Sequence, residues 1–152
     1  MKTILVALDF SDSTDPILDA ACRISQLEGA SLVLVHAVEP IPEFVGYDAG
    51  AVVAAGSEPT PDMFLPRLNE IKTELQNRGI PATAAQETGV PADVILAKAE
   101  EVGAGMIIMG SHGHGALFHL LVGSVTETVL KKTGVPVLIV PLRSKDDGER
   151  GD

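Results

Sequence analysis

Short apolar runs alternate with amphipathic segments along most of this chain. Residues 3 to 8 form an apolar run that contains β-branched side chains, which predicts a buried strand. Asp9 and the polar residues after it indicate a turn at the end of this strand. Apolar side chains then recur at helical spacing until Gly29, which predicts an amphipathic helix that ends there. The inward-facing side chains predicted for this helix are Ile17, Ala21, Ile24 and Leu27.

The same alternation continues to residue 140. Residues 82 to 87 are the least apolar of the strand-like runs, which predicts that this strand lies at an edge of the sheet. In the last helix, Ser124 and Glu127 have the spacing of a capping box, and Gly134 follows its end. The further strands are predicted at residues 32–38, 82–87, 106–109 and 137–140, and the further helices at 64–79, 91–102 and 124–133.

Strands that alternate with helices predict an α/β domain. Right-handed crossovers between parallel strands place helices over both faces of the sheet. In such sheets, ligands bind beyond the carboxyl ends of the strands, where the winding direction reverses. Asp9, residues 36 to 38 and Gly110 lie at such ends. The pattern therefore predicts one shared binding site at this edge of the sheet.

The length of 152 residues fits one folded domain, which we assign to residues 1–142. Within it, residues 39–61 are rich in proline and glycine, which predicts a long surface loop or lid. Residues 143–152 are polar and of mixed charge, so we expect a disordered tail there.

Acidic residues outnumber basic ones by 21 to 11, and the formal net charge of -10 would repel a nucleic-acid backbone. Cys22 is the only cysteine, so no disulfide can form within the chain. The sequence has neither a signal-peptide cleavage pattern nor an apolar stretch of membrane-spanning length. We therefore expect a cytoplasmic protein that binds neither nucleic acid nor membranes.

The glycine-rich segment from Gly110 to Ser124 carries the candidate chemistry. Holding a phosphate requires several N–H donors around one small volume, and glycine permits close backbone approach and φ > 0. The start of the last helix adds N–H groups without partners and the positive end of a helix dipole. Donors on both sides of the segment are therefore predicted to hold the phosphates of a small molecule.

Two better-known phosphate motifs are absent from the sequence. A run that starts as G-x-G at Gly113 has Phe118 where the dinucleotide-binding pattern needs its third glycine. The pattern G-x-x-x-x-G-K-[ST] does not occur, so the lysine and hydroxyl of a P-loop enzyme are missing. These absences argue against a Rossmann dehydrogenase and a P-loop enzyme.

The segment instead resembles the universal stress protein family, whose nucleotide-binding members carry G-x2-G-x9-G-[ST]. Gly110, Gly113, Gly123 and Ser124 stand at that spacing. The likeness extends from the first strand through residues 88–91 to the closing run at 135–140. Only the predicted loop and the tail fall outside it.

The resemblance implies a Rossmann-like, α-hydrolase-like three-layer sandwich whose five-stranded parallel sheet has the order 3-2-1-4-5. Asp9 and residues 36–38 would line an adenine and ribose pocket, and the motif residues would hold the phosphates. The family also commonly dimerises through its last strand, here Val137 to Pro141. The residues assigned to the nucleotide site are Ala7, Asp9, Phe10, Ser11, His36, Ala37, Val38, Met109, Gly110, Ser111, His112, Gly113, His114, Gly115, Gly123, Ser124, Val125 and Thr126.

Many members of the family act as ATP-dependent regulators in stress responses, and others lack nucleotide. The resemblance thus implies a dimeric regulator that binds ATP, ADP or AMP, with magnesium arriving on the nucleotide and at most slow hydrolysis. The alternative is a member that binds no nucleotide and serves as a dimeric protein-interaction module. Where many relatives have arginine, this loop has His114 and His119, so we hypothesise that phosphate affinity rises as the pH falls.

Several candidate residues also have simpler interpretations. His112, His114 and His119 could ligate a metal ion, although no cysteine supports them. Ser111, His112 and Asp9 lack the G-x-S-x-G context of a hydrolase nucleophile. The residues with a purely structural alternative are Asp9 and Ser124, as helix caps, and His36, as a ring packed on the core.

Overall fold

A computed structural model describes residues 1–40, 64–112 and 122–141. The strands are β1 (Thr3–Ala7), β2 (Ser31–Val38), β3 (Ala82–Thr88), β4 (Met106–Gly110) and β5 (Val137–Val140). The helices are α1 (Thr14–Glu28), α2 (Leu65–Asn77), α3 (Pro91–Glu101) and α4 (Ser124–Lys132). From residue 41 onward the predicted loop 39–61 lies outside the described residues, as does the predicted tail.

The five strands form one sheet in the order β3-β2-β1-β4-β5, and every neighbouring pair is parallel. This confirms the predicted order and the predicted edge position of β3. The centre of the sheet is β1, where Ile4 lies opposite Leu32 of β2 and Met106 of β4. Its carboxyl end therefore lies between the carboxyl ends of β2 and β4.

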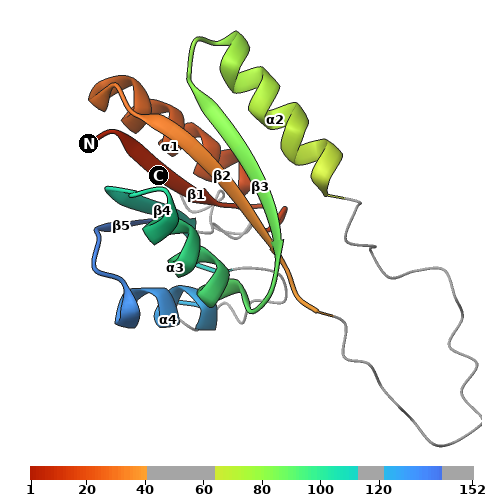
Figure 1. Ribbon diagram of the computed structural model, residues 1–152, viewed down its shortest axis with the longest axis vertical. Coiled ribbons are helices and arrows are strands. Elements are labelled where there is room, and N and C mark those ends of the chain that lie inside the picture. The colour runs from red at the N-terminus through yellow and green to blue at the C-terminus, as the bar shows by residue number, and fades with distance from the viewer. Residues whose placement is uncertain (41–63, 113–121, 142–152) are drawn as a thin grey trace, which may run out of the picture.

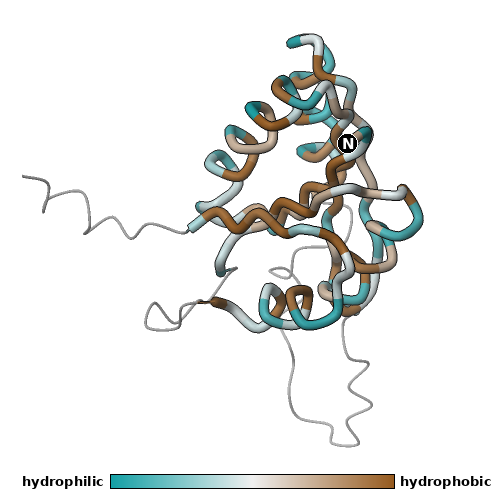
Figure 2. Tube along the Cα trace, turned by 90° about the vertical axis from the view of Figure 1, so that its left-hand side faces the viewer, coloured by the Kyte–Doolittle hydropathy of each residue, from teal (hydrophilic) through white to brown (hydrophobic). Residues whose placement is uncertain are grey.

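Helices cover both faces of the sheet (Figure 1). One face packs against α1 and α2, and the other packs against α3 and α4. Because successive side chains of a strand point to opposite faces, Ile4 and Val6 of β1 enter the first core and Leu5 enters the second. Apolar residues accordingly run through the middle of the trace, between the helices (Figure 2). The predicted three-layer sandwich is confirmed.

One predicted core position is wrong. Leu27 of α1 is 81% exposed, whereas Ile17 and Ala21 are buried as expected. At about 100° per residue, Leu27 lies about 80° away from Ile17 around the helix. Cys22 and Ser25 are buried in the same helix. Cys22 and Ser25 lie on the other side of Ile17 from Leu27, so the buried stripe is displaced toward them, and apolarity alone placed Leu27 inside it.

None of the described helices is long and apolar enough to cross a membrane.

Candidate functional site

The carboxyl ends of β1, β2 and β4 lie along the same edge of the sheet, as predicted for a shared site. β1 ends at Ala7, β2 at Val38 and β4 at Gly110. Gly113, His114 and Gly115 lie outside the described residues. The described part of the candidate site is therefore formed by the three strand ends and the start of α4.

Two hydrogen bonds connect the end of β4 to the start of α4. The N–H of Gly123 donates to the carbonyl oxygen of Ser111 at 2.7 Å. The hydroxyl of Thr126, a residue only 3% exposed, donates to the carbonyl oxygen of Gly110 at 2.9 Å. The two halves of the glycine motif are thus adjacent in space, although nine residues or more separate them in sequence.

Close packing, and not unusual dihedral angles, accounts for Gly110 and Gly123. Neither residue is among the described glycines with positive φ. A Cβ atom on Gly110 would lie 3.1 Å from the hydroxyl of Ser13 and 3.3 Å from Ile17, both in or next to α1. A Cβ atom on Gly123 would lie 3.3 Å from the carbonyl oxygen of Ser111. Any side chain at either position would therefore force its neighbours to move.

The start of α4 differs from the predicted capping box. Gly123 is the N-cap residue, and Ser124 is the first residue of the helix. No side chain among the described residues caps this helix. Glu127 instead pairs with Lys131, with Oε1 and Nζ 2.7 Å apart. The capping box is therefore wrong, because the chain enters the helix one residue earlier than the serine spacing implied.

The first turn of α4 presents amide donors beside the carboxyl end of β4. The first N–H groups of a helix have no intrahelical partners and carry the positive end of its dipole. The amide of Gly123 is engaged by Ser111, so the available donors begin at Ser124, which is exposed. The hydrogen bond from the ammonium of Lys131 lowers the pKa of Glu127. The Glu127 carboxylate therefore stays negatively charged, and this charge is paired with Lys131. This arrangement favours binding of an anion.

His112 follows β4 and lies against the start of α4. Its Nδ1 and the hydroxyl of Ser111 share a hydrogen bond of 3.1 Å. Its Nε2 is buried and has no hydrogen-bond partner among the described residues. A Cβ atom on Gly123 would lie 3.9 Å from Cδ2 of this ring.

The turn between β1 and α1 holds three more of the predicted site residues. The N–H of Ser11 donates to the Asp9 carboxylate at 3.0 Å, and the hydroxyls of Ser11 and Ser13 are 2.7 Å apart. Phe10 between them has a φ of 59°, in the left-handed region that non-glycine residues rarely adopt. Asp9 thus stabilises this turn through Ser11, but it does not cap α1, whose N-cap residue is Ser13.

His36 and Phe10 belong to an aromatic cluster on the face covered by α1 and α2. The ring of His36 donates from Nδ1 to the carbonyl oxygen of Leu8 at 2.8 Å and contacts Phe10 at a centroid distance of 4.9 Å. Phe64, directly before α2, stacks on Phe10 at 5.2 Å. Ala37 and Val125 pack in the opposite core. The predicted site residues are therefore divided between both faces of the sheet.

Sequence reasoning overlooked this division and the contribution of Phe64. Alternation along β2 places His36 on the same face as Leu32 and Leu34, so strand periodicity alone could have shown it. Phe64 could not be found in this way, because its contact joins residues far apart in the sequence.

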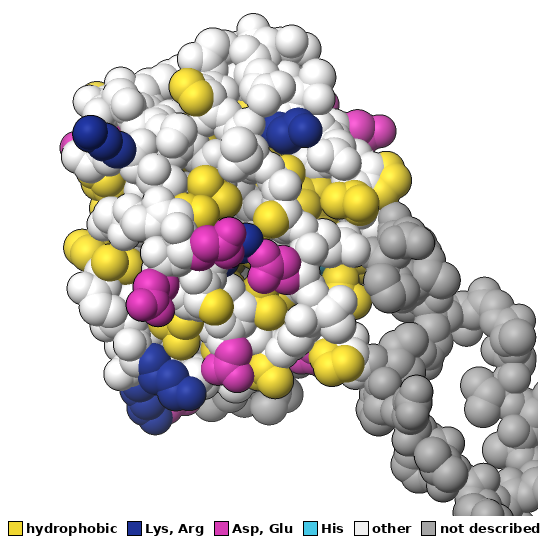
Figure 3. Space-filling model, in the orientation of Figure 1, with side chains coloured by type: hydrophobic (Ala, Val, Ile, Leu, Met, Phe, Trp, Pro, Cys, Tyr) yellow, Lys and Arg dark blue, Asp and Glu magenta, His cyan; other side chains and the backbone are white. Residues whose placement is uncertain are grey.

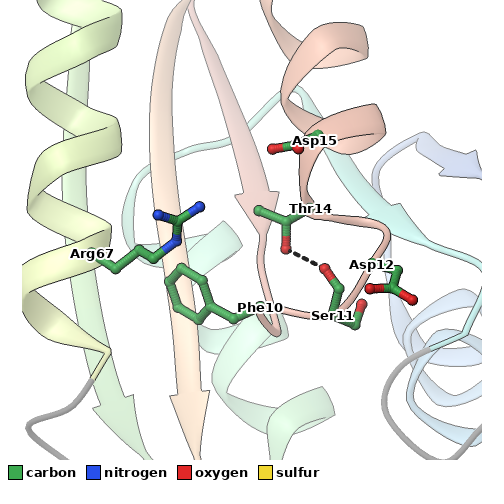
Figure 4. Close-up of a pocket in the computed structure, with 6 residues that line it drawn as sticks. All are labelled: Phe10, Ser11, Asp12, Thr14, Asp15 and Arg67. Atoms are coloured by element: carbon green, nitrogen blue, oxygen red, sulfur yellow. Dashed lines mark hydrogen bonds between the residues drawn. The ribbon is translucent and has the colours of Figure 1, made fainter.

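A small pocket of about 200 Å³ lies at the β1–α1 turn (Figure 4). The turn contributes Phe10, Ser11 and Asp12, and α2 contributes Arg67. No residue of β4 or α4 lines it. The lining of this pocket therefore does not include the start of α4.

The described residues contain no group of three or more His, Cys, Asp or Glu side chains placed to hold a metal ion. Two of the three histidines considered as ligands, His114 and His119, lie outside the described residues.

Comparisons with known proteins give a consistent family match. The sequence model of the universal stress protein family matches residues 1–141. Universal stress protein MJ0577 of Methanocaldococcus jannaschii is 31% identical over 153 residues, covering 91% of this chain and 94% of that protein. Universal stress protein A homolog 2 of Coxiella burnetii is 36% identical over 148 residues, covering 93% and 96%.

Solved structures show the same fold. The structure of MJ0577 superposes with a TM-score of 0.75 and 27% identity, over 95% of this chain and 98% of that one. A universal stress protein in complex with cAMP superposes with a TM-score of 0.68 and 24% identity, over 93% and 98%.

Proposed function

The chain belongs to the universal stress protein family, and from this membership we propose that it is an ATP-binding, dimeric regulatory protein of the cytoplasmic stress response. ADP and AMP share the adenine, the ribose and the α-phosphate of ATP, and the proposal includes them as ligands of the same site. The proposal includes no catalytic residue, and any ATP hydrolysis is slow.

The observation that carries the proposal is the hydrogen bond between Gly123 and Ser111. It brings the uncapped first turn of α4 beside the end of β4. The motif spacing in the sequence and this contact in the structure therefore support the same phosphate position. The attraction of a phosphate to nearby backbone donors exceeds its repulsion by distant acidic residues, because salt screens charges beyond about 8 to 10 Å.

The adenosine part of the nucleotide is proposed to lie toward the ends of β1 and β2. Ala7 and Ala37 pack against the core covered by α3 and α4, and Met109 is buried there. These side chains give an apolar border on the same face as α4. The relative solved with cAMP shares this fold, and the preference for adenine nucleotides here rests on the family membership.

Ser124 offers a sharp test, because its amide and its hydroxyl can be removed separately. Ser124→Pro deletes the amide, and proline suits the first position of a helix. Gly123, with φ -73° and ψ 166°, already has the extended conformation that a residue before proline requires. We expect Ser124→Pro to weaken ATP binding about tenfold or more, measured by calorimetry.

Ser124→Ala is the matched control, since it removes only the hydroxyl and keeps the amide. Its affinity for ATP should stay closer to that of the wild type than the affinity of Ser124→Pro. Chromatography of small molecules released from denatured, freshly purified protein should also yield an adenine nucleotide. A wild-type chain with no released nucleotide and no ATP binding would favour the alternative, a dimeric protein-interaction module.

A further inference from the structure

The pocket at the β1–α1 turn brings together opposite charges that do not pair with each other. Arg67 lines it from α2, whereas Asp12 lines it from the turn and Asp15 from the first turn of α1. In Figure 4 the side chain of Arg67 extends from α2 toward the side on which the Asp15 carboxylate points. None of the three side chains forms an ion pair with another described residue. Their charges are therefore available to a molecule that enters the pocket.

The walls of this pocket are fixed by contacts within the protein. The Thr14 hydroxyl donates to the carbonyl oxygen of Ser11 at 2.8 Å, which holds the turn against the start of α1 (Figure 4). Phe64 stacks on the ring of Phe10, with the two centroids 5.2 Å apart. The polar wall and the aromatic wall are thus in place before a ligand binds, which lowers the entropic cost of binding.

The volume of the pocket, about 200 Å³, limits the ligand to a small molecule. Sites for drug-sized ligands have volumes of about 300 to 1,000 Å³. A free amino acid is of a suitable size, and it carries a carboxylate and an ammonium close together. The charges that line the pocket are complementary to both groups.

We propose that this pocket binds a free α-amino acid with an apolar side chain. The carboxylate of the ligand pairs with the guanidinium of Arg67, whose planar fork suits that group. The ammonium pairs with Asp15, and the apolar side chain lies against Phe10. Asp12 adds a second negative charge, so a ligand that carries only an anion is repelled.

Binding of an amino acid here does not depend on the proposed function. Phe10 packs against the core covered by α1 and α2, whereas Val125 at the start of α4 packs in the opposite core. The family resemblance assigned Phe10 and Ser11 to the nucleotide, but both line this pocket. The amino acid is accordingly a second ligand, and it should bind without competition from ATP.

Three small molecules separate the two charges of the ligand. L-leucine carries both charges, 4-methylpentanoate is leucine without its ammonium, and isoamylamine is leucine without its carboxylate. NMR titrations of the ¹⁵N-labelled full-length protein follow the amide signals of Phe10, Thr14 and Arg67. We expect L-leucine to move these signals with a Kd of about 1 mM, because charge pairs open to solvent are weak.

The other two molecules should bind at least about tenfold more weakly, since each lacks one charge pair. Amide signals that L-leucine leaves unmoved at about 10 mM would overturn the proposal. Equal binding of the three molecules would also overturn it, because the two charges would then contribute nothing.

Arg67→Gln and Asp15→Asn each remove one charge from the pocket and keep a polar side chain. Both residues are exposed, so the fold should tolerate the changes. Each variant should bind L-leucine about tenfold more weakly than the wild type. Arg23→Gln and Asp19→Asn are the matched controls, at exposed positions of α1 outside the pocket, and should bind it like the wild type. Equal affinities of all four variants would contradict the assigned charge pairs.

Titration of L-leucine in the presence of saturating ATP shows whether the two ligands share a site. The affinity for L-leucine should stay within about twofold of its value without ATP, because independent sites have no coupling free energy. Displacement of L-leucine by ATP would assign the pocket to the nucleotide and refute the second site. A protein that binds L-leucine but no ATP would support this site and refute the proposed function.

Discussion

The hydroxyl of Thr126 helps to hold the start of α4 against the end of β4. Thr126 donates from this hydroxyl to the carbonyl oxygen of Gly110 and is almost fully buried. Its place among the predicted site residues came from the motif, but its contact is with the protein itself. Thr126 therefore positions the amide donors of α4 and does not need to touch a ligand to influence binding.

Thr126→Val should lower the free energy of unfolding by about 1–2 kcal/mol, because it leaves the partly buried Gly110 carbonyl without this donor while keeping the side-chain volume. Urea denaturation at pH 7 measures the change. Thr128→Val is the matched control on the same helix, since the Thr128 hydroxyl donates to Ser124 at an exposed position. Equal losses for the two variants would refute the assigned role of Thr126.

At the scale of elements, a cluster of charges connects β3 to α3. Lys98 is only 8% exposed and pairs with Glu87 at the end of β3 and with Glu101 on its own helix. Hydrogen bonds from its ammonium to Glu101 and then Glu87 raise the pKa of Lys98, although burial acts in the opposite direction. Acidic side chains accordingly gather over α3, and basic ones near the end of α4 (Figure 3). Lys98 therefore balances part of the acidic surface on this face.

Lys98→Met keeps the aliphatic stem and removes the charge. We expect a loss of about 1 kcal/mol at pH 7, because both carboxylates are partly solvated and are not stranded in the core. The raised pKa belongs to the folded state, so the stabilisation is complete below about pH 10.4 and is lost as the pH rises through the folded value.

Urea denaturation of Lys98→Met and of the wild type at pH 7, 9 and 11 tests this linkage. The difference between the two proteins should be the same at pH 7 and 9 and smaller at pH 11. A difference that did not shrink at pH 11 would show that Lys98 stabilises the protein through its stem alone.

At the scale of the whole molecule, β5 lies at the edge of the sheet and pairs only with β4. Ile107 of β4 and Ser111, which follows β4, donate to the carbonyl oxygens of Pro136 and Val140. Because bonding directions alternate along a strand, the main-chain groups of Val137 and Ile139 face the open side. The proposed dimer through Val137 to Pro141 would cover this edge.

Ile139→Pro removes an outward N–H without removing any bond to β4, and proline is tolerated on edge strands. If the dimer pairs these edges, the variant should be a folded monomer by light scattering coupled to size-exclusion chromatography. Ile139→Val, which keeps the N–H, should remain a dimer at the same concentration. Ile139→Pro that is folded and still dimeric would place the interface elsewhere.

The predicted dependence on pH also belongs to the whole molecule, because it requires the segment from residue 113 to 121. His114 and His119 lie there, outside the described residues, so the rise of phosphate affinity at lower pH stays a prediction. ATP titrations between acid and neutral pH test it, and an affinity that is independent of pH would remove it.

The order of elements, the buried strands and the glycine spacing followed from the sequence alone. Each depends on short-range periodicity, and strands such as β1 and β4 are too apolar to lie anywhere but between helices. Alternation even determined the face of His36, although the prediction did not use it.

Only the tertiary structure decided which groups of the motif are available for a ligand. It engages the Gly123 amide with Ser111 and leaves Nε2 of His112 without a partner among the described residues. It also explains Gly110 by the close approach of Ser13 from α1. These outcomes depend on contacts between segments far apart in the chain. The spacing of residues within one segment does not show which groups of another segment will contact them.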